Sequence, residues 1–161
     1  DDYELFWIGT TTPQIFYINA EPDFDIYITT VSFIIAGPGA SLSEFANLSA
    51  LSNGCRFYYE DNNGEINIGT NLKSNFEFVR LCQGNPSFGG GASAFLANNV
   101  VGTSEAFIPV FDFRNFGFKW GLKLAASSQN RLVLEINDNL SPSANLTGFN
   151  AVAYGFRRIL D

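Results

Sequence analysis

The chain has 161 residues, of which 46% are hydrophobic and 16% are charged, and it contains no histidine and no methionine. This balance is typical of one ordered globular domain, and the missing histidines exclude Ser-His-Asp triads and histidine metal sites. Sixteen acidic against nine basic residues give a formal charge of −7, which argues against direct binding to nucleic acid or to an anionic membrane surface.

Apolar and polar residues alternate with a period of two along most of the chain, carried by β-branched and aromatic side chains, and this pattern predicts strands. The longest alternating segment spans residues 24–35. Its apolar residues change parity at Thr29-Thr30, so we expect a bulge or bend there. Shorter strands are expected at residues 5–8, 14–19, 55–60, 65–68, 94–96, 106–113, 118–122, 131–137 and 150–157.

Residues typical of turns and of short helices separate these predicted strands. Asn62-Asn63-Gly64 predicts a hairpin between residues 55–60 and 65–68, because an Asn-Gly pair supplies the positive φ angles of a tight primed turn. Short helices are expected at residues 41–48 and 74–81, each behind a serine that can cap it. The glycine-rich segment 84–91 has no phosphate-binding spacing and is expected to be a loop.

Eight to ten short strands with almost no helix predict an all-β fold. The expected architecture is a jelly-roll (Greek-key) β-sandwich of about eight short antiparallel strands, with one or two short helices in loops. Residues 24–161 are expected to form this sandwich and residues 1–23 an N-terminal strand or arm, within a single domain.

Carboxylates are the acid and base groups that remain for chemistry at neutral pH. Glu21, Asp23 and Asp25 alternate along one segment and could bind a hard cation, but acids on the solvent side of a strand are the simpler interpretation. Asp112 near Arg114 predicts a surface ion pair. Neither group defines a catalytic site, and we expect no enzyme activity, no metal and no cofactor.

Cys55 and Cys82 lie 27 positions apart and lack the spacing of metal ligands. Two buried free thiols are the expected arrangement, and a disulfide between the two cysteines is the alternative. A reactive catalytic thiol is the least expected use, because no histidine is present to activate it.

The chain is rich in aromatic residues, with 17 Phe, 6 Tyr and 2 Trp. A sandwich core takes many of these rings, and the surplus is expected on a surface that a partner covers. The residues expected on this partner-binding surface are Phe6, Trp7, Phe116, Phe118 and Trp120. A platform for a sugar ring is the other use of exposed aromatic rings.

Several short segments occur in an order that resembles a known family. They are Val31-Ser32-Phe33 in the first long strand, residues 51–54 leading into 55–59, Leu72-Lys73-Ser74-Asn75 before a short helix, residues 132–141, and Tyr154-Gly155-Phe156 in the last strand. Across residues 24–160 the chain resembles small jelly-roll virion structural proteins of tailed bacteriophages, the capsid cement or decoration proteins.

This resemblance implies a non-enzymatic protein on the capsid surface of a virion. Such a protein binds the major capsid protein, stabilises the head shell and assembles as a homotrimer. An alternative is a carbohydrate- or receptor-binding, lectin-like jelly roll, which would expose Trp7 or Trp120 beside Asn and Asp side chains. A carboxylate-only glycosidase is a third possibility and needs two acids about 5 to 10 Å apart in a cleft.

Overall fold

The computed structural model describes residues 3–7, 14–36, 51–83, 94–98, 105–140 and 148–160. These residues form ten strands, one α-helix and one 3-10 helix, so the all-β prediction is confirmed. The elements are β1 (Tyr3–Trp7), β2 (Gln14–Asn19), β3 (Phe24–Ala36), β4 (Cys55–Asp61), β5 (Gly64–Leu72), α1 (Asn75–Gln83), β6 (Ala94–Asn98), β7 (Glu105–Asp112), η2 (Phe113–Phe116), β8 (Leu122–Leu124), β9 (Arg131–Ile136) and β10 (Gly148–Ile159).

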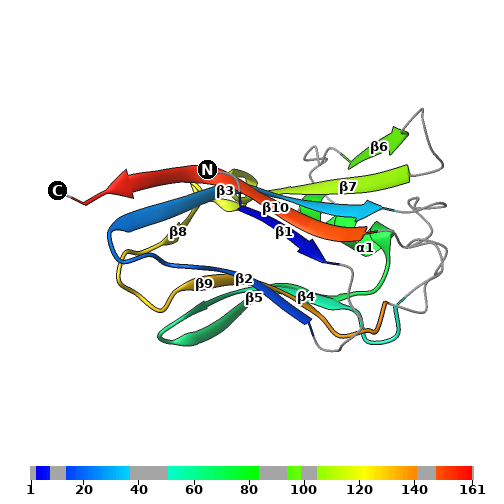
Figure 1. The fold of residues 1–161 in the computed structure, drawn as a ribbon, viewed down its shortest axis with the longest axis horizontal. Coiled ribbons are helices and arrows are strands. Elements are labelled where there is room, and N and C mark those ends of the chain that lie inside the picture. Colours follow the sequence, from blue (N-terminus) through cyan, green and yellow to red (C-terminus); the bar gives the residue numbers. More distant parts are fainter. Residues whose placement is uncertain are drawn as a thin grey trace.

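The strands form two antiparallel sheets that lie face to face (Figure 1). The first sheet has six strands in the order β1-β10-β3-β7-β6, and β8 pairs with β3 beside this path. The second sheet has four strands in the order β2-β9-β4-β5. The two N-terminal strands therefore enter different sheets, where β1 pairs with β10 and β2 with β9.

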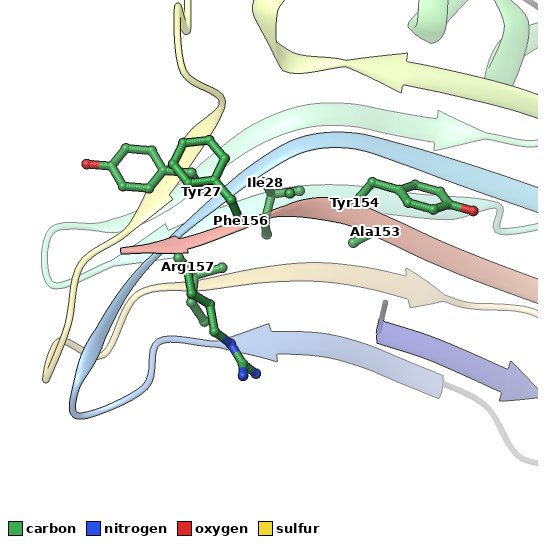
Figure 2. Close-up of a pocket in the computed structure, with 8 residues that line it drawn as sticks. Tyr27, Ile28, Ala153, Tyr154, Phe156 and Arg157 are labelled. Carbon is green, nitrogen blue, oxygen red and sulfur yellow. The ribbon is translucent and has the colours of Figure 1, made fainter. Parts of the chain in front are cut away.

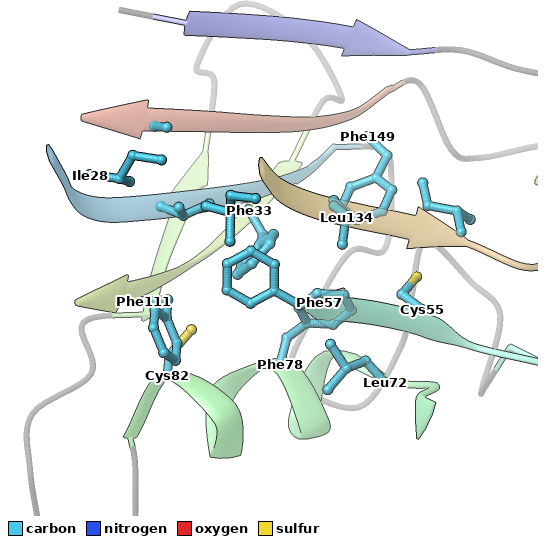
Figure 3. Packing of buried hydrophobic residues seen from close by; sticks show 14 of the residues in the cluster. Ile28, Phe33, Cys55, Phe57, Leu72, Phe78, Cys82, Phe111, Leu134 and Phe149 are labelled. Carbon is cyan, nitrogen blue, oxygen red and sulfur yellow. The ribbon is translucent and has the colours of Figure 1, made fainter. Parts of the chain in front are cut away.

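The core lies between the sheets and contains many phenylalanine rings. Phe57 of β4 contacts Phe33 of β3 edge to face at 5.3 Å and Phe111 of β7 at 5.5 Å, which joins the two sheets. The helix α1 sends Phe78 and Cys82 into the same core (Figure 3). Part of the aromatic excess is therefore core packing, since edge-to-face ring pairs add to the burial of their area.

A bulge interrupts β3 where the sequence predicts it. Ile28 pairs with Gly155 of β10 and Thr30 pairs with Tyr154, which leaves Thr29 as the extra residue. The Thr29 hydroxyl donates a hydrogen bond of 2.9 Å to the carbonyl oxygen of Tyr154. The buried apolar residues of β3 on the two sides of the bulge are Ile26, Ile28, Val31 and Phe33, so the extra residue keeps one face of the strand in the core.

The predicted β4–β5 hairpin is confirmed, but the prediction of a primed turn within it is wrong. Gly64 has a φ of 118°, whereas neither Asn62 nor Asn63 has a positive φ. The Asp61 carboxylate accepts a hydrogen bond of 2.7 Å from the backbone N–H of Asn63 and closes a local Asx turn. The two turn residues thus keep ordinary angles, and Gly64 alone takes the conformation that side chains disfavour.

The helix expected at residues 74–81 is confirmed as α1, which begins at Asn75. The Glu77 carboxylate accepts a hydrogen bond of 3.1 Å from the backbone N–H of Ser74, as in a capping box. The helix expected at residues 41–48 and the loop expected at 84–91 lie outside the described residues.

The prediction of a strand at residues 118–122 is wrong, because β8 begins only at Leu122. The 3-10 helix η2 and a turn precede it. Gly117 and Gly121 have φ values of 90° and 97°, which an extended strand does not contain. Gly121 also lies so close to the carbonyl oxygen of Ile28 that a side chain there would overlap it. The alternation of aromatic residues in this segment therefore resembles a strand pattern, although the backbone forms a turn.

A carboxylate connects the end of β9 to the residues before β4. Asp138 accepts hydrogen bonds from the backbone N–H groups of Ser52 at 3.0 Å, Asn53 at 3.1 Å and Gly54 at 2.6 Å. The backbone N–H of Asn137 donates back to Gly54 at 3.1 Å. This contact fixes the start of β4, whose first residue, Cys55, is buried.

Candidate partner-binding surface

The connection from β7 to β8 presents three exposed aromatic side chains, which we call the aromatic turn. Phe116, Phe118 and Trp120 have exposed fractions of 40%, 44% and 62%. The turn begins at Asp112, whose carboxylate accepts from the backbone N–H of Arg114 at 2.9 Å and pairs with its guanidinium at 2.7 Å. The ion pair predicted for these two residues is confirmed. The same Asp112 carboxylate caps η2 through its hydrogen bond from the Arg114 backbone N–H.

Core rings hold two of the three exposed rings, Phe116 and Phe118, in place. Phe116 stacks on Phe111 with a centroid distance of 4.5 Å and an interplanar angle of 14°. Phe118 packs edge to face on Phe113 at 5.9 Å. Phe111 and Phe113 are both 1% exposed, and both contact Phe57. A partner that covers these surface rings would lose little side-chain entropy, because their positions are already set.

The five residues expected at a partner surface come from two elements. Phe116, Phe118 and Trp120 lie together in the aromatic turn, while Phe6 and Trp7 lie on β1, opposite Asn150 and Phe149 of β10. The orientation of the Phe6 and Trp7 side chains is outside the described part of the structure.

A second aromatic group, which the sequence did not predict, lies at the bulge between β3 and β10, where Tyr154 and Phe156 are exposed and Tyr27 is half-buried. Tyr27 and Phe156 stack with a centroid distance of 4.9 Å and an interplanar angle of 8° (Figure 2). Beside them, both strands line a small pocket of about 120 Å³ that also includes Tyr154 and Gly155. Register shows that Tyr27 and Phe156 face each other, and register is set by tertiary pairing that one sequence does not reveal.

The three acids considered as a cation site form no metal-binding group in the described ranges, and the expectation that they lie on the solvent side is wrong for Asp25. Asp25 is 4% exposed, accepts from Lys123 Nζ at 2.6 Å and accepts from the backbone N–H of Ala126 at 3.0 Å. The hydrogen bond from Lys123 lowers the pKa of this carboxyl. Glu21 pairs with Arg157 of β10 at 2.8 Å. Among the described residues, no group of three or more histidine, cysteine, aspartate or glutamate side chains could hold a metal ion.

The prediction of two buried free cysteines is confirmed. Cys55 and Cys82 are buried and form no disulfide. Burial raises the pKa of the Cys55 thiol well above its ordinary value and raises the pKa of Cys82 to about 12. Both thiols are therefore protonated at neutral pH, whereas a thiolate is the nucleophilic form.

No protein family, curated protein or solved structure matches this chain. The helices in the described ranges are all too short or too polar to span a membrane. Any assignment of function therefore depends on the residues and geometry described above.

Proposed function

We propose that the two sheets are connected as a jelly roll. When β6 and β8 are set aside, the remaining eight strands form sheets with the orders β1-β10-β3-β7 and β2-β9-β4-β5. In such a fold the first of eight strands pairs with the last, the second with the seventh, the third with the sixth and the fourth with the fifth. The pairs β1–β10, β2–β9, β3–β7 and β4–β5 follow this scheme and support the proposal.

We further propose that the chain is a non-enzymatic viral structural protein. It is a decoration protein that binds the major capsid protein on the surface of a tailed-bacteriophage head and stabilises the shell as a homotrimer. The sequence resemblance motivates this assignment, and the strand order is compatible with it because jelly rolls are frequent in viral capsid proteins.

The aromatic turn is the observation that carries the proposal. Large aromatic side chains fixed in well-packed surroundings are the residues on which protein interfaces most depend. Phe118 and Trp120 remain 44% and 62% exposed although Phe118 is anchored on the core. Such a rigid apolar surface favours a protein partner, because covering it removes apolar area from water at low entropic cost.

Quantitative mass spectrometry of purified virions that encode the chain tests this function. We expect the polypeptide in a fixed ratio to the major capsid protein. The double variant Phe118→Ser/Trp120→Ser is expected to be lost from the particles, while Ile66→Ser, which changes an exposed apolar residue of the second sheet, is retained. Virions that lack the wild-type chain would refute the proposal.

A further inference from the structure

A polar pocket of about 480 Å³ lies at one end of the second sheet, whereas the aromatic turn leads into β8 of the first sheet. The end of β2, the start of β9 and the end of β4 meet there side by side, since Asn19 pairs with Arg131 and Arg131 pairs with Glu60. The segment before β9 forms the rest of the wall. The lining residues are Asn19, Ala20, Glu60, Asp61, Ser128, Gln129, Asn130 and Arg131.

Backbone and side-chain hydrogen bonds hold the wall of the pocket in place. The N–H of Ala20 donates to the carbonyl oxygen of Asn130 at 2.9 Å, which ties the end of β2 to the segment before β9. The Ser128 hydroxyl accepts from the N–H of Asn130 at 3.2 Å and donates to the carbonyl oxygen of Ala125 at 2.6 Å. The amide and carboxylate groups that line the pocket are thus carried by a fixed backbone.

An aromatic ring lies directly beside this polar wall. Tyr17 is two residues before Asn19 on β2, so both side chains are on the same face of the strand. Tyr17 is 49% exposed, and the Arg131 guanidinium lies 5.9 Å from its ring centroid. Tyr17 is not among the residues that line the pocket, so this partly exposed ring borders the polar site next to Arg131.

We propose that this pocket binds a neutral saccharide. The sugar hydroxyl groups bond to the side chains of Asn19, Gln129 and Asn130, and the sugar ring extends over the edge of the pocket onto the exposed part of Tyr17. A sugar fits because its hydroxyl edges match the polar lining and its C–H faces match the bordering Tyr17 ring. The pocket volume lies within the range of about 300–1,000 Å³ that small-molecule sites occupy.

The charges of the site disfavour other ligands. An anion would meet Glu60 and Asp61 on a chain of net charge −7, and Glu60 already pairs with the cation Arg131. A divalent cation is disfavoured because Glu60 already pairs with Arg131, and no group of three or more histidine, cysteine, aspartate or glutamate side chains in the described ranges could hold a metal ion. An apolar ligand would leave the polar lining without hydrogen bonds.

The test uses the full chain and a panel of neutral sugars, namely glucose, galactose, mannose, N-acetylglucosamine, maltose and lactose. Amide chemical shifts are followed by nuclear magnetic resonance while each sugar is added up to about 50 mM, which covers weak millimolar affinities. We expect saturable shifts in residues 17–20, 60–61 and 128–131 for at least one sugar.

Variants separate binding at this pocket from other causes. Tyr17→Ala is expected to weaken binding about tenfold or more, while Tyr17→Phe keeps the ring and nearly all of the affinity. Gln129→Ala, at an exposed position, is expected to weaken binding without affecting the fold. Tyr154→Ala, on the other sheet, is the matched control and leaves binding unchanged.

Three results would overturn the inference. The first is that no sugar of the panel gives saturable shifts, the second is that the shifts map to the aromatic turn or to Tyr154, and the third is that Tyr17→Ala binds as tightly as the wild type. None of these results bears on capsid binding, which is measured on virions through the aromatic turn.

Discussion

Gly155 shows how a single residue can be restricted by a tertiary contact. A Cβ at this position would overlap the backbone carbonyl oxygen of Tyr27 on the neighbouring strand. We expect Gly155→Ala to lower the free energy of unfolding by about 1–3 kcal/mol or more, because the obstacle is backbone and cannot rotate away. Urea unfolding measures this loss. Gly155 has no positive φ, so the expected loss comes from the contact with Tyr27 and not from backbone strain, and an unchanged urea midpoint for Gly155→Ala would contradict the argument.

Asp25 and Lys123 predict a dependence of stability on pH. The hydrogen bond between them lowers the pKa of Asp25 below its ordinary value of 3.8. A carboxyl with a lowered pKa in the folded state contributes stability that is present above its unfolded pKa and is lost as the pH falls through the folded pKa. The difference in Tm between wild type and Asp25→Asn is therefore expected to be large near pH 7 and to shrink below about pH 4. A difference that stays constant down to about pH 2 would show that the pair contributes nothing through its charge.

At the scale of the elements, the Asp138 contact decides how β4 begins. Its carboxylate satisfies backbone N–H groups of residues 52–54, which lie up to 86 positions earlier in the chain. Asp138→Ala is expected to reduce the free energy of unfolding by about 1.5–3 kcal/mol, the range for hydrogen bonds to a charged group. Asp138→Asn keeps one acceptor oxygen and is expected to lose less. Thermal or urea unfolding distinguishes these variants, and an unchanged stability of Asp138→Ala would show that water replaces the carboxylate without cost.

Strands were predictable here because their signal is local. The alternation of residues 24–35 and its parity change at Thr29 are both visible in the sequence, and both reappear in β3. The turn before β8 was not predictable, because Gly117 and Gly121 hold their positive φ values in a segment whose aromatic alternation is that of a strand. The Asp138 contact was missed for a similar reason, since an aspartate that ends a strand does not show which distant backbone it will meet.

At the scale of the whole molecule, the candidate surface was only partly predictable. An aromatic excess shows that rings are available, and the choice of Phe116, Phe118 and Trp120 agrees with their exposure. The stacked pair of Tyr27 and Phe156 and the polar pocket beside Tyr17 each depend on register between strands far apart in the chain. Strand register comes from packing of the complete sandwich, so no single segment carries the information.

The proposed homotrimer gives a prediction for the molecule in solution. Light scattering after size-exclusion chromatography is expected to give the mass of three chains, as the resemblance to decoration proteins implies. The aromatic turn is assigned to the capsid partner, so Phe118→Ser/Trp120→Ser is expected to keep this mass and an unchanged far-ultraviolet β-sheet spectrum. Ile66→Ser, 56% exposed before substitution, is likewise expected to keep the trimer. A wild-type chain that remains monomeric at every concentration would remove the trimer from the proposal, and a double variant that falls to monomers would place the aromatic turn in the trimer interface instead of against the capsid.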